Sequence, residues 1–540
     1  MSAREKVSHV DTAWLRMDRP ENLMQIVGVM IFAGRIDSER LKRTIVHRLL
    51  CYRRFRQIAT LDADGAWWVD DPDFDIDTHL RHSLLPAPGS ESELQKFVAE
   101  MASTPLNPAR PRWEFNLVEI ADGNSALVVR IHHAIADGIA LIGVTNALTD
   151  AQIDAPEESE RSTATGASAD RPGTAGDASD RGEFFWELVL EPLSEVTASV
   201  LSVGCKLWGQ YLALRKESAP IGDLARIGGA VAREIGKLAL MPADSPTRFK
   251  GKPGTVKRVA WSEPISLAEI KATGKALGCS VNDTLLAAAA GALRGYLMAK
   301  GDVVNGAEIR VMVPVNLRAP NDSGDLGNRF GLVALELPIG IENPLARLYA
   351  TRARMAALKG SYQALLTYAL LGAAGMAPGF VEEQLLRLLA GKTTAVMTNV
   401  PGSPQPRYLA GQSIDRQMVW VPQTGDIGMG VSILSYNQRV QLGVITDKGM
   451  VDDPQNIVDR FADEFEKLLW LVLLQPGDRL ADPDAVAEDL ARSPPGQADP
   501  RRQREQRGTA TAKPQSASSA RAASTSRRSI ASIGVKAAAS

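Results

Sequence analysis

The sequence predicts a mixed α/β or α+β fold, built in two parts whose sheets are flanked by helices. Three observations lead to this class. Runs rich in β-formers, such as 309–317, 331–339 and 440–447, alternate with segments of helical periodicity. A polar, low-complexity stretch interrupts this pattern in the first third of the chain. With 540 residues, 45% of them hydrophobic, the chain is long enough to bury two or more cores.

The chain divides where its composition changes. We expect an N-terminal part at 1–150, a flexible linker at 151–182, a helical crossover segment at 183–250, a C-terminal part at 251–480 and a disordered basic tail at 481–540. The crossover helix is expected to bend at Pro192. From Arg501 onward the tail carries nine basic residues against one acidic residue, which suits either a solvated extension or a tether to anionic lipid or another polyanion.

Local signals predict individual elements within the two parts. We expect strands at 65–70 and 127–131, a hairpin over 113–131, one helix at 38–50 and two helices over 266–299. Ser38 is the expected N-cap of the first helix, because serine accepts hydrogen bonds from the first turn. Gly278 is expected to separate the other two helices.

Charge and cysteine content exclude several classes of protein. The formal net charge of -2 gives no whole-protein field that favours nucleic acid as a partner. The three cysteines lie far apart without a CxxC pair, so neither a disulfide framework nor structural zinc is expected, and a reducing cytoplasm is the natural compartment. The N-terminus lacks the apolar core of a secretory signal, and the longest apolar run, 368–380, is interrupted by glycine and proline.

Common catalytic signatures are also missing from the sequence. There is no GxSxG elbow, the "GKTT" at Gly391 lacks the earlier glycine of a P-loop, and the "GMG" at Gly428 lacks the third glycine of a dinucleotide loop. Covalent serine catalysis, ATP chemistry and NAD chemistry therefore have no local support. We expect no cofactor and no metal.

The segment "RIHHAIADG" at 130–138 is the main candidate for chemistry. An imidazole can accept and return a proton near neutral pH, and His132 and His133 stand where a strand is expected to end. Adjacent strand residues point to opposite faces, which disfavours a shared metal ion and favours one working and one structural histidine. Asp137 could orient the loop or simply cap a helix, and Gly138 allows close backbone approach or an unusual dihedral angle. Taken alone, the motif could also be incidental.

The segment matches the HHxxxDG motif of a group of acyltransferases that includes chloramphenicol acetyltransferases and peptide-synthetase condensation domains. Further blocks, in order, resemble the bacterial wax ester synthase/diacylglycerol acyltransferase family. They are "HVDTAWLRMDRPENLMQIVGVMIF", "FDIDTHLRHSLLP", "PLNPARPRWEF", "VNDTLLAAAAGALRGYL", "VPVNLR", "LGNRFG", "TNVPGSP" and "ILSYNQRVQLGVITD". The resemblance covers about residues 8 to 470 without the linker.

This resemblance implies two chloramphenicol-acetyltransferase-like domains with the active site at their interface, open to long-chain acyl-CoA from one side and to diacylglycerol or a fatty alcohol from the other. It implies that His133 is a general base that needs no covalent intermediate, with His132 as its packed neighbour. Asp137 is expected to pair with Arg318. Asn282 and Asp283 are expected either to cap a helix or to act near the reacting carbonyl, and Asn399 to shape the interface or a turn.

Three positions depart from the family pattern. Arg112 stands where leucine is usual, Ser403 where proline is usual and Asn437 where glycine is usual, which bears on substrate preference and loop shape rather than on the reaction class. Two other functions stay open: a condensation-type acyltransferase acting on other acceptors, and a catalytically silent protein of lipid surfaces. Lipid substrates would place the protein in the cytoplasm, in peripheral contact with the inner membrane or lipid inclusions.

Overall fold

The structure is a computed structural model that describes residues 4–62, 65–153, 155, 242–318, 326–359, 363–376 and 391–474. Residues 1–490 form one compact unit and 491–540 a second. The expected tail, and most of the expected linker and crossover segment, lie outside the described residues, so these assignments stay predictions. The account below concerns the first unit.

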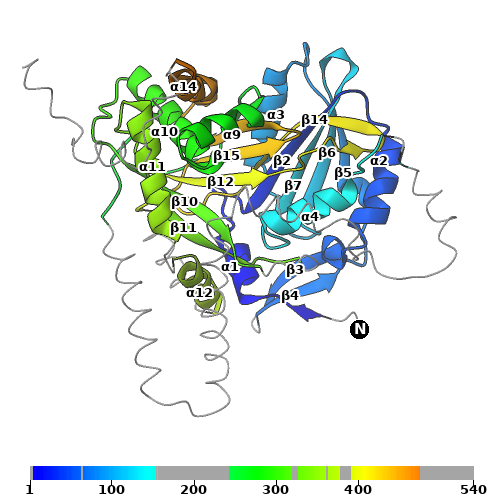
Figure 1. The fold of residues 1–540 in the computed structure, drawn as a ribbon. Coiled ribbons are helices and arrows are strands. Elements are labelled where there is room, and N and C mark those ends of the chain that lie inside the picture. Colours follow the sequence, from blue (N-terminus) through cyan, green and yellow to red (C-terminus); the bar gives the residue numbers. More distant parts are fainter. Residues whose placement is uncertain are drawn as a thin grey trace, which may run out of the picture. The chain divides into compact units, whose positions relative to one another are not determined.

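A six-stranded mixed sheet contains β7, the strand that ends at His132 (Figure 1). Its strands, in spatial order, are β13 (Tyr408–Leu409), β14 (Gln412–Trp420), β2 (Gln25–Phe32), β7 (Ser125–His132), β6 (Trp113–Glu119) and β5 (Leu80–Leu84). Only the β5–β6 pair is parallel among these. Since β13 and β14 come from the C-terminal part of the chain, the two parts share this sheet.

A second, seven-stranded sheet is built from the C-terminal part. Its strands, in spatial order, are β11 (Phe330–Leu337), β10 (Ile309–Asn316), β12 (Ala395–Pro401), β15 (Met429–Tyr436), β16 (Arg439–Asp447) and β8 (Lys257–Trp261), with β9 (Ile265–Ser266) paired to β16. β12 is parallel to both of its neighbours, while the other pairs are antiparallel. The expected mixture of parallel and antiparallel pairing is therefore present.

Helices cover these sheets, and a third sheet is small. In the described ranges the α-helices are α1 (His9–Met17), α2 (Ser38–Thr44), α3 (Glu91–Ser103), α4 (Gly138–Leu148), α9 (Leu267–Ala276), α10 (Val281–Ala299), α11 (Pro344–Lys359), α12 (Gln363–Met376) and α14 (Gln455–Leu474). The small antiparallel sheet joins β1 (Glu5–Lys6), β4 (Gly65–Asp70) and β3 (Gln57–Asp62). α12 lies against β11 so closely that a Cβ on Gly331 would come within 1.8 Å of the Ala364 carbonyl oxygen.

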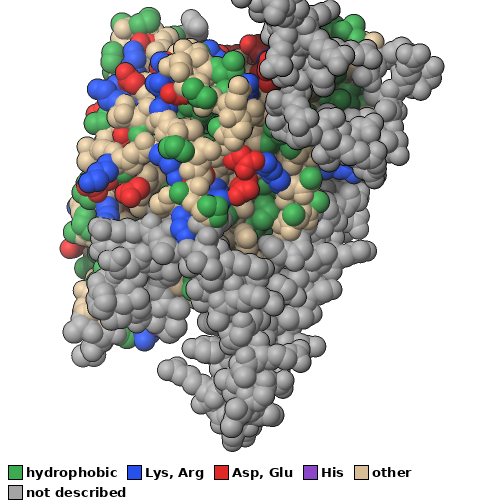
Figure 2. All heavy atoms as spheres, turned by 90° about the vertical axis from the view of Figure 1, so that its left-hand side faces the viewer, with side chains coloured by type: hydrophobic (Ala, Val, Ile, Leu, Met, Phe, Trp, Pro, Cys, Tyr) green, Lys and Arg blue, Asp and Glu red, His purple; other side chains and the backbone are tan. Residues whose placement is uncertain are grey.

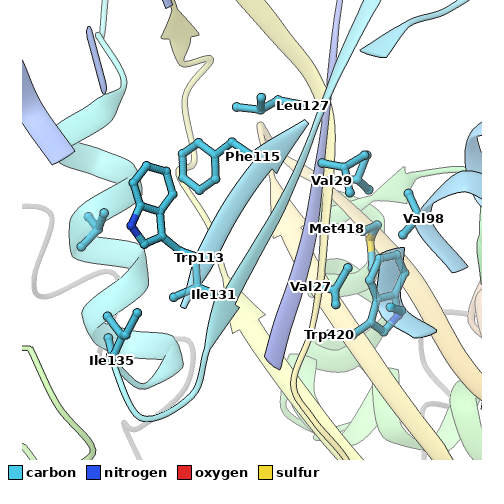
Figure 3. Packing of buried hydrophobic residues seen from close by; sticks show 14 of the residues in the cluster. Val27, Val29, Val98, Trp113, Phe115, Leu127, Ile131, Ile135, Met418 and Trp420 are labelled. Atoms are coloured by element: carbon cyan, nitrogen blue, oxygen red, sulfur yellow. The ribbon is translucent and has the colours of Figure 1, made fainter. Parts of the chain in front are cut away.

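Two large apolar cores hold the unit together. Trp113, Phe115 and Ile131 pack on one face of the six-stranded sheet, and Val27, Met418 and Trp420 on the other (Figure 3). The second core lies between the seven-stranded sheet and the helices α9, α10 and α14 (Figure 1). Strands β8, β15 and β16 also contribute side chains to the first core, so the two sheets pack against each other.

Most of the elements expected from sequence are present, with two corrections. The strands at 65–70 and 127–131, the hairpin over 113–131 and the helices on either side of Gly278 are confirmed. The expected helix at 38–50 is α-helical only to Thr44 and continues as a π-helical turn over Ile45–Leu49. Its N-cap is Asp37 rather than Ser38, because the Asp37 carboxylate accepts the Arg40 N–H at 2.7 Å.

The described residues can be compared with the requirements for a membrane span, and the face drawn in Figure 2 shows how charge is distributed there. Among the described residues no single helix has the length and apolar composition needed to cross a bilayer; α9 and α10 reach both only as a pair bent by 100°. On the face drawn in Figure 2, basic and acidic side chains are interspersed wherever the surface is described.

Candidate active site

The histidine pair lies where β7 passes into α4. β7 ends at His132, a short loop follows, and α4 begins at Gly138. Asp137 is the N-cap of α4, and its carboxylate accepts the Ala140 N–H at 2.8 Å. The capping alternative for Asp137 is therefore correct, although it is not the only contact of this residue.

His133 is enclosed on several sides. Only 3% of it is exposed, and its backbone N–H donates to the Met24 carbonyl at 2.7 Å. Trp14 of α1 stacks on the imidazole with ring centroids 4.2 Å apart and planes 15° apart, and Phe330 of β11 lies 5.5 Å away. Aromatic faces from both parts of the chain therefore hold the ring of His133.

This burial sets the protonation state of His133. Burial lowers its pKa from 6.5 to about 4, against the opposing charge of Asp137, so the imidazole is neutral at physiological pH. Its Nδ1 is buried and has no hydrogen-bond partner among the described residues. A neutral imidazole is the form that can accept a proton.

His132 has different surroundings. It is 2% exposed, and its Nδ1 accepts the Ala134 N–H at 3.1 Å. Its proton therefore belongs on Nε2, which lies 3.5 Å from Asp18 Oδ2 and 3.4 Å from Arg112 Nη1. Burial lowers the pKa of His132, and Asp18 opposes that effect. Both ring nitrogens have partners within the fold, as expected of a packed neighbour.

Arg318 does pair with Asp137. Its Nη2 lies 3.0 Å from Asp137 Oδ2, and both side chains are about 4% exposed. Asp137 Oδ2 also accepts the Arg329 N–H at 2.9 Å, and Arg318 donates to the Gly327 carbonyl at 2.6 Å. This buried ion pair ties the loop after β7 to the segment between β10 and β11.

Gly138 faces open space. A Cβ built on it meets nothing within 4 Å, and its φ is not in the left-handed region. The expected unusual dihedral angle and close backbone approach within the fold are therefore both absent. The apolar residues that follow, Ile139, Leu141 and Ile142, are only half-buried. The start of α4 thus combines open space at Gly138 with half-buried apolar side chains on the residues that follow.

The remaining candidates form a separate group. Asn399 Nδ2 donates to Asn282 Oδ1 at 2.9 Å, which joins β12 to the start of α10. The N-cap of α10 is Ser280, and Asp283 completes a capping box by accepting the Ser280 N–H at 3.0 Å. The capping alternative therefore holds for Asp283 and is wrong for Asn282. In the described part of the chain, neither asparagine makes a hydrogen bond to His133.

Several residues around His133 were not singled out from the sequence. Asn328 donates through Nδ2 to the His133 carbonyl and to Asp11 Oδ1, both at 2.7 Å. Gly327, beside it, has φ +110°, which glycine alone adopts readily. Asp11 and Trp14 belong to the block "HVDTAWLRMD", and Asn328 to "LGNRFG". The polar and aromatic residues of those blocks were the available signal, but nothing in the sequence indicated that the two blocks meet.

A metal site has no structural support in the ranges described. No group of three or more His, Cys, Asp or Glu side chains is placed there to hold an ion. His132 and His133 have different surroundings, with Asp18 and Arg112 beside the first and Trp14 and Phe330 beside the second.

Comparison with known proteins identifies the class. The sequence matches the wax ester synthase/diacylglycerol acyltransferase catalytic domain over residues 7–285 and the C-terminal domain of the same family over 326–469. The chain is an O-acyltransferase, of the kind that forms triacylglycerol or wax ester. It belongs to the wax ester synthase/diacylglycerol acyltransferase family.

Individual relatives agree with this assignment. A probable diacylglycerol O-acyltransferase of Mycobacterium tuberculosis (strain ATCC 25618 / H37Rv) is 27% identical over 441 residues, which are 80% of this chain and 88% of that protein. The O-acyltransferase WSD of Acinetobacter baylyi is 25% identical over 430 residues, covering 78% of this chain and 86% of its own.

The fold is shared with solved structures. The wax ester synthase/diacylglycerol acyltransferase from Marinobacter aquaeolei VT8 superposes with a TM-score of 0.61 at 20% identity, over 87% of this chain and 100% of that chain. The first condensation domain of the calcium-dependent antibiotic synthetase gives 0.51 at 15% identity, over 89% and 98%. The expected fold class is confirmed.

Proposed function

We propose that the protein transfers the acyl group of a long-chain acyl-CoA to the hydroxyl of diacylglycerol or a long-chain fatty alcohol, with His133 as general base. The observation that carries this proposal is the buried imidazole of His133, which packs against Trp14 and Phe330 just after β7 and is neutral because burial lowers its pKa to about 4. The half-buried apolar residues Ile139, Leu141 and Ile142 at the start of α4 suit contact with the aliphatic chains of such substrates.

The reaction needs one proton carrier. His133 removes the proton of the acceptor hydroxyl as the oxygen attacks the thioester carbonyl, and the new C–O bond forms. When the C–S bond breaks, the imidazolium returns the proton to the departing CoA sulfur, so the enzyme ends unchanged. Since Nδ1 is enclosed, Nε2 is the nitrogen that meets the hydroxyl.

The low pKa of His133 limits how long the imidazolium persists. An imidazolium with a pKa of about 4 is a strong acid, so it gives its proton to the departing CoA sulfur as soon as negative charge develops there. The carboxylate of Asp137 and the indole face of Trp14 both favour the charged ring during that interval. We propose that no cofactor or metal takes part.

Contact with a lipid surface accompanies this function in our proposal. Large apolar side chains are exposed near the end of α14, with Trp470 55%, Leu473 62% and Leu474 77% exposed. Such residues insert readily at a membrane interface. The protein would then work in the cytoplasm, in peripheral contact with the inner membrane or with lipid inclusions, where its substrates gather.

One assay tests the reaction and its base. The full-length protein is supplied with radiolabelled palmitoyl-CoA and either hexadecanol or diolein, with and without EDTA. We expect ester with at least one acceptor, no effect of EDTA, and turnover at least ~100-fold lower in His133→Gln. His47→Gln, at an exposed histidine, is the matched control and should behave as wild type.

Each other outcome rejects a particular claim. Full activity of His133→Gln would reject the assignment of His133 as the general base. Absence of ester with any acceptor would favour a silent protein of lipid surfaces, and product formed only with amine acceptors would favour condensation-type chemistry. Flotation with anionic liposomes tests the lipid contact: Leu473→Ser/Leu474→Ser should float less than wild type, and equal flotation would reject the role of α14.

A further inference from the structure

The segment 18–24, which joins α1 to β2, contacts both histidines of the site. The Met24 carbonyl accepts the His133 N–H at 2.7 Å, and the Asp18 carboxylate lies 3.5 Å from Nε2 of His132. Asp18 also accepts the Met24 N–H at 2.9 Å, so the two contacting groups are tied to each other. Where this segment lies therefore decides where the main chain of His133 is held.

Most of this segment is a tight turn that rests on the C-terminal part of the chain. Arg19 and Asn22 exchange backbone hydrogen bonds of 3.3 and 3.0 Å, which close the turn. The side chain of Asn22 points inward, because the residue is only 4% exposed. Its Nδ2 donates to the carbonyls of Gly425 and Ile427 at 2.6 and 3.3 Å. The turn 19–22 is thus anchored to a segment about 400 positions away.

A buried ammonium group supplies the second anchor of the turn. Nζ of Lys257, the first residue of β8, donates to the Glu21 carbonyl at 2.6 Å and lies 3.3 Å from Asn22 Oδ1. It also lies 3.3 Å from Asp447 Oδ2 and from the Gly254 carbonyl. The Lys257 side chain is 5% exposed. Burying a charge is costly unless it is paired and hydrogen-bonded, and these four oxygen atoms provide that compensation.

The seven-stranded sheet holds this ammonium in place. Lys257 and Asp447 are cross-strand partners on β8 and β16. Asp447 accepts the Gly254 N–H at 2.7 Å through Oδ2 and the Gly449 N–H at 2.8 Å through Oδ1, so its carboxylate is fixed on both sides. The Lys257 N–H donates to Ser103 Oγ at 2.8 Å. The sheet therefore offers the turn a cation whose position is set independently of the turn.

The path from this cation to the catalytic base is short. Lys257 holds Glu21 and Asn22, and a single residue, Leu23, separates Asn22 from Met24. A shift of the turn is therefore carried to the carbonyl that accepts the His133 N–H. A misplacement of about 1 Å can cost about 100-fold in rate when it reaches a catalytic group.

We propose that Lys257 is a positioning residue for acyl transfer: its ammonium holds the turn 19–22 on the seven-stranded sheet and so fixes the Met24 carbonyl that binds the main chain of His133. This inference rests on the proposed function, in which His133 is the general base. Lys257 acts through the turn and not on the reacting atoms.

A matched pair of variants separates positioning from loss of stability. Lys257→Met removes the ammonium and keeps an unbranched side chain. We expect its kcat to fall about 10- to 100-fold with KM within about threefold of wild type, as for a misplaced catalytic group. Arg347→Met is the control, because it also removes a buried cation from an ion pair, with Glu464, but the other hydrogen bonds of Arg347 go to carbonyls at 287, 341 and 342. Its kcat should stay within about twofold of wild type at a temperature at which both variants are folded. A wild-type kcat in Lys257→Met, or the same loss in Arg347→Met, would overturn the inference.

A milder variant carries the test if Lys257→Met does not fold. Asn22→Ala frees one side of the turn and leaves Lys257 paired with Asp447, so no buried charge loses its partner. We expect its kcat to fall about 3- to 10-fold, again with little change in KM. The double variant Lys257→Met/Asn22→Ala should lose no more kcat than Lys257→Met, because both changes free the same turn. Losses that multiply, or a wild-type kcat in Asn22→Ala, would overturn the inference.

Amide hydrogen exchange gives a readout that does not depend on activity. The exchange of full-length wild type, Lys257→Met, Asn22→Ala and Arg347→Met is followed by mass spectrometry. Peptides that cover 130–138 should exchange faster in Lys257→Met and Asn22→Ala than in wild type and Arg347→Met, while peptides that cover β15 should not differ. Equal exchange over 130–138 in all four proteins would overturn the inference. Activity in His133→Gln would instead reject the proposed function, so the two failures are distinguishable.

Discussion

The indole of Trp14 and the imidazole of His133 are stacked, with ring centroids 4.2 Å apart and planes 15° apart. A π face next to a ring that becomes cationic stabilises the charge by up to about 2 kcal/mol when water is excluded. Trp14→Phe keeps such a face, and Trp14→Leu does not. We expect Trp14→Leu to lower kcat about tenfold more than Trp14→Phe at similar thermal stability. Equal kcat in the two variants would mean that the indole only fills space.

The ion pair between Asp137 and Arg318 should be a major element of stability. Arg318→Met leaves a buried carboxylate without its cation, which costs about 3–5 kcal/mol of unfolding free energy. Arg354→Met is the control, because its pair with Glu308 is partly exposed and should contribute no more than about 1 kcal/mol. Urea denaturation measures both. A loss at Arg318 no larger than that at Arg354 would contradict this assignment.

Gly138 offers a test of where substrate lies. Gly138→Ala should fold with unchanged stability or a gain of up to about 1 kcal/mol, since no atom lies within 4 Å of the added Cβ and alanine favours helices. If substrate occupies that space, kcat/KM should fall by about tenfold from one methyl group. Gly143→Ala, which adds a Cβ to open space farther along α4, should leave kcat/KM unchanged. Equal kcat/KM in both variants would place the substrate elsewhere.

The pH dependence of stability should contain two opposing contributions. The pKa of His133 falls from 6.5 to about 4 on folding, so between these values the unfolded chain binds more protons and stability rises with pH. Burial raises the pKa of Asp11 from 3.8 to about 6, so in that window the folded chain binds more protons and stability falls as pH rises. Each shift corresponds to about 3 kcal/mol, and the two nearly cancel.

Single variants should reveal each contribution. In Asp11→Asn the contribution of His133 remains, and the unfolding free energy should rise between pH 4 and 6.5 more steeply than in wild type, because only the low pKa of His133 then acts. In His133→Gln the contribution of Asp11, whose pKa is raised, remains, and the unfolding free energy should fall as pH rises from 3.8 to 6. Urea denaturation in a pH series measures both slopes. Parallel curves for all three proteins would show that neither group titrates in this way.

Much of the fold could be predicted because it depends on local pattern. Alternation in 440–447 and the helical period around Gly278 each identify an element from its own residues. The Asp37 cap was missed because aspartate and serine stand next to each other and both cap well. The π-helical turn at Ile45–Leu49 has no pattern that distinguishes it from an α-helix. The strand β14 was not predicted, and its partner β2 lies far away in sequence.

The site was only partly predictable for the same reason. His133 and Asp137 stand in one short motif, whereas Asn328 reaches His133 across 195 positions of sequence. Asp137 and Arg318 could be paired only through the family resemblance. The environments that distinguish His132 from His133 depend on Ala134, Asp18 and Trp14, and no single-sequence rule places these around the two rings.

The position of β14 between β13 and β2 limits how the chain can be split into two separately expressed fragments. A fragment that ended in the segment after 150 would leave β2, with its apolar sequence "QIVGVMIF", as an unprotected edge ready to pair with other chains. The complementary fragment would carry β14 without its neighbour. We expect the two fragments to assemble without a covalent link only if they are produced together, because each fragment must then bind the other before it aggregates.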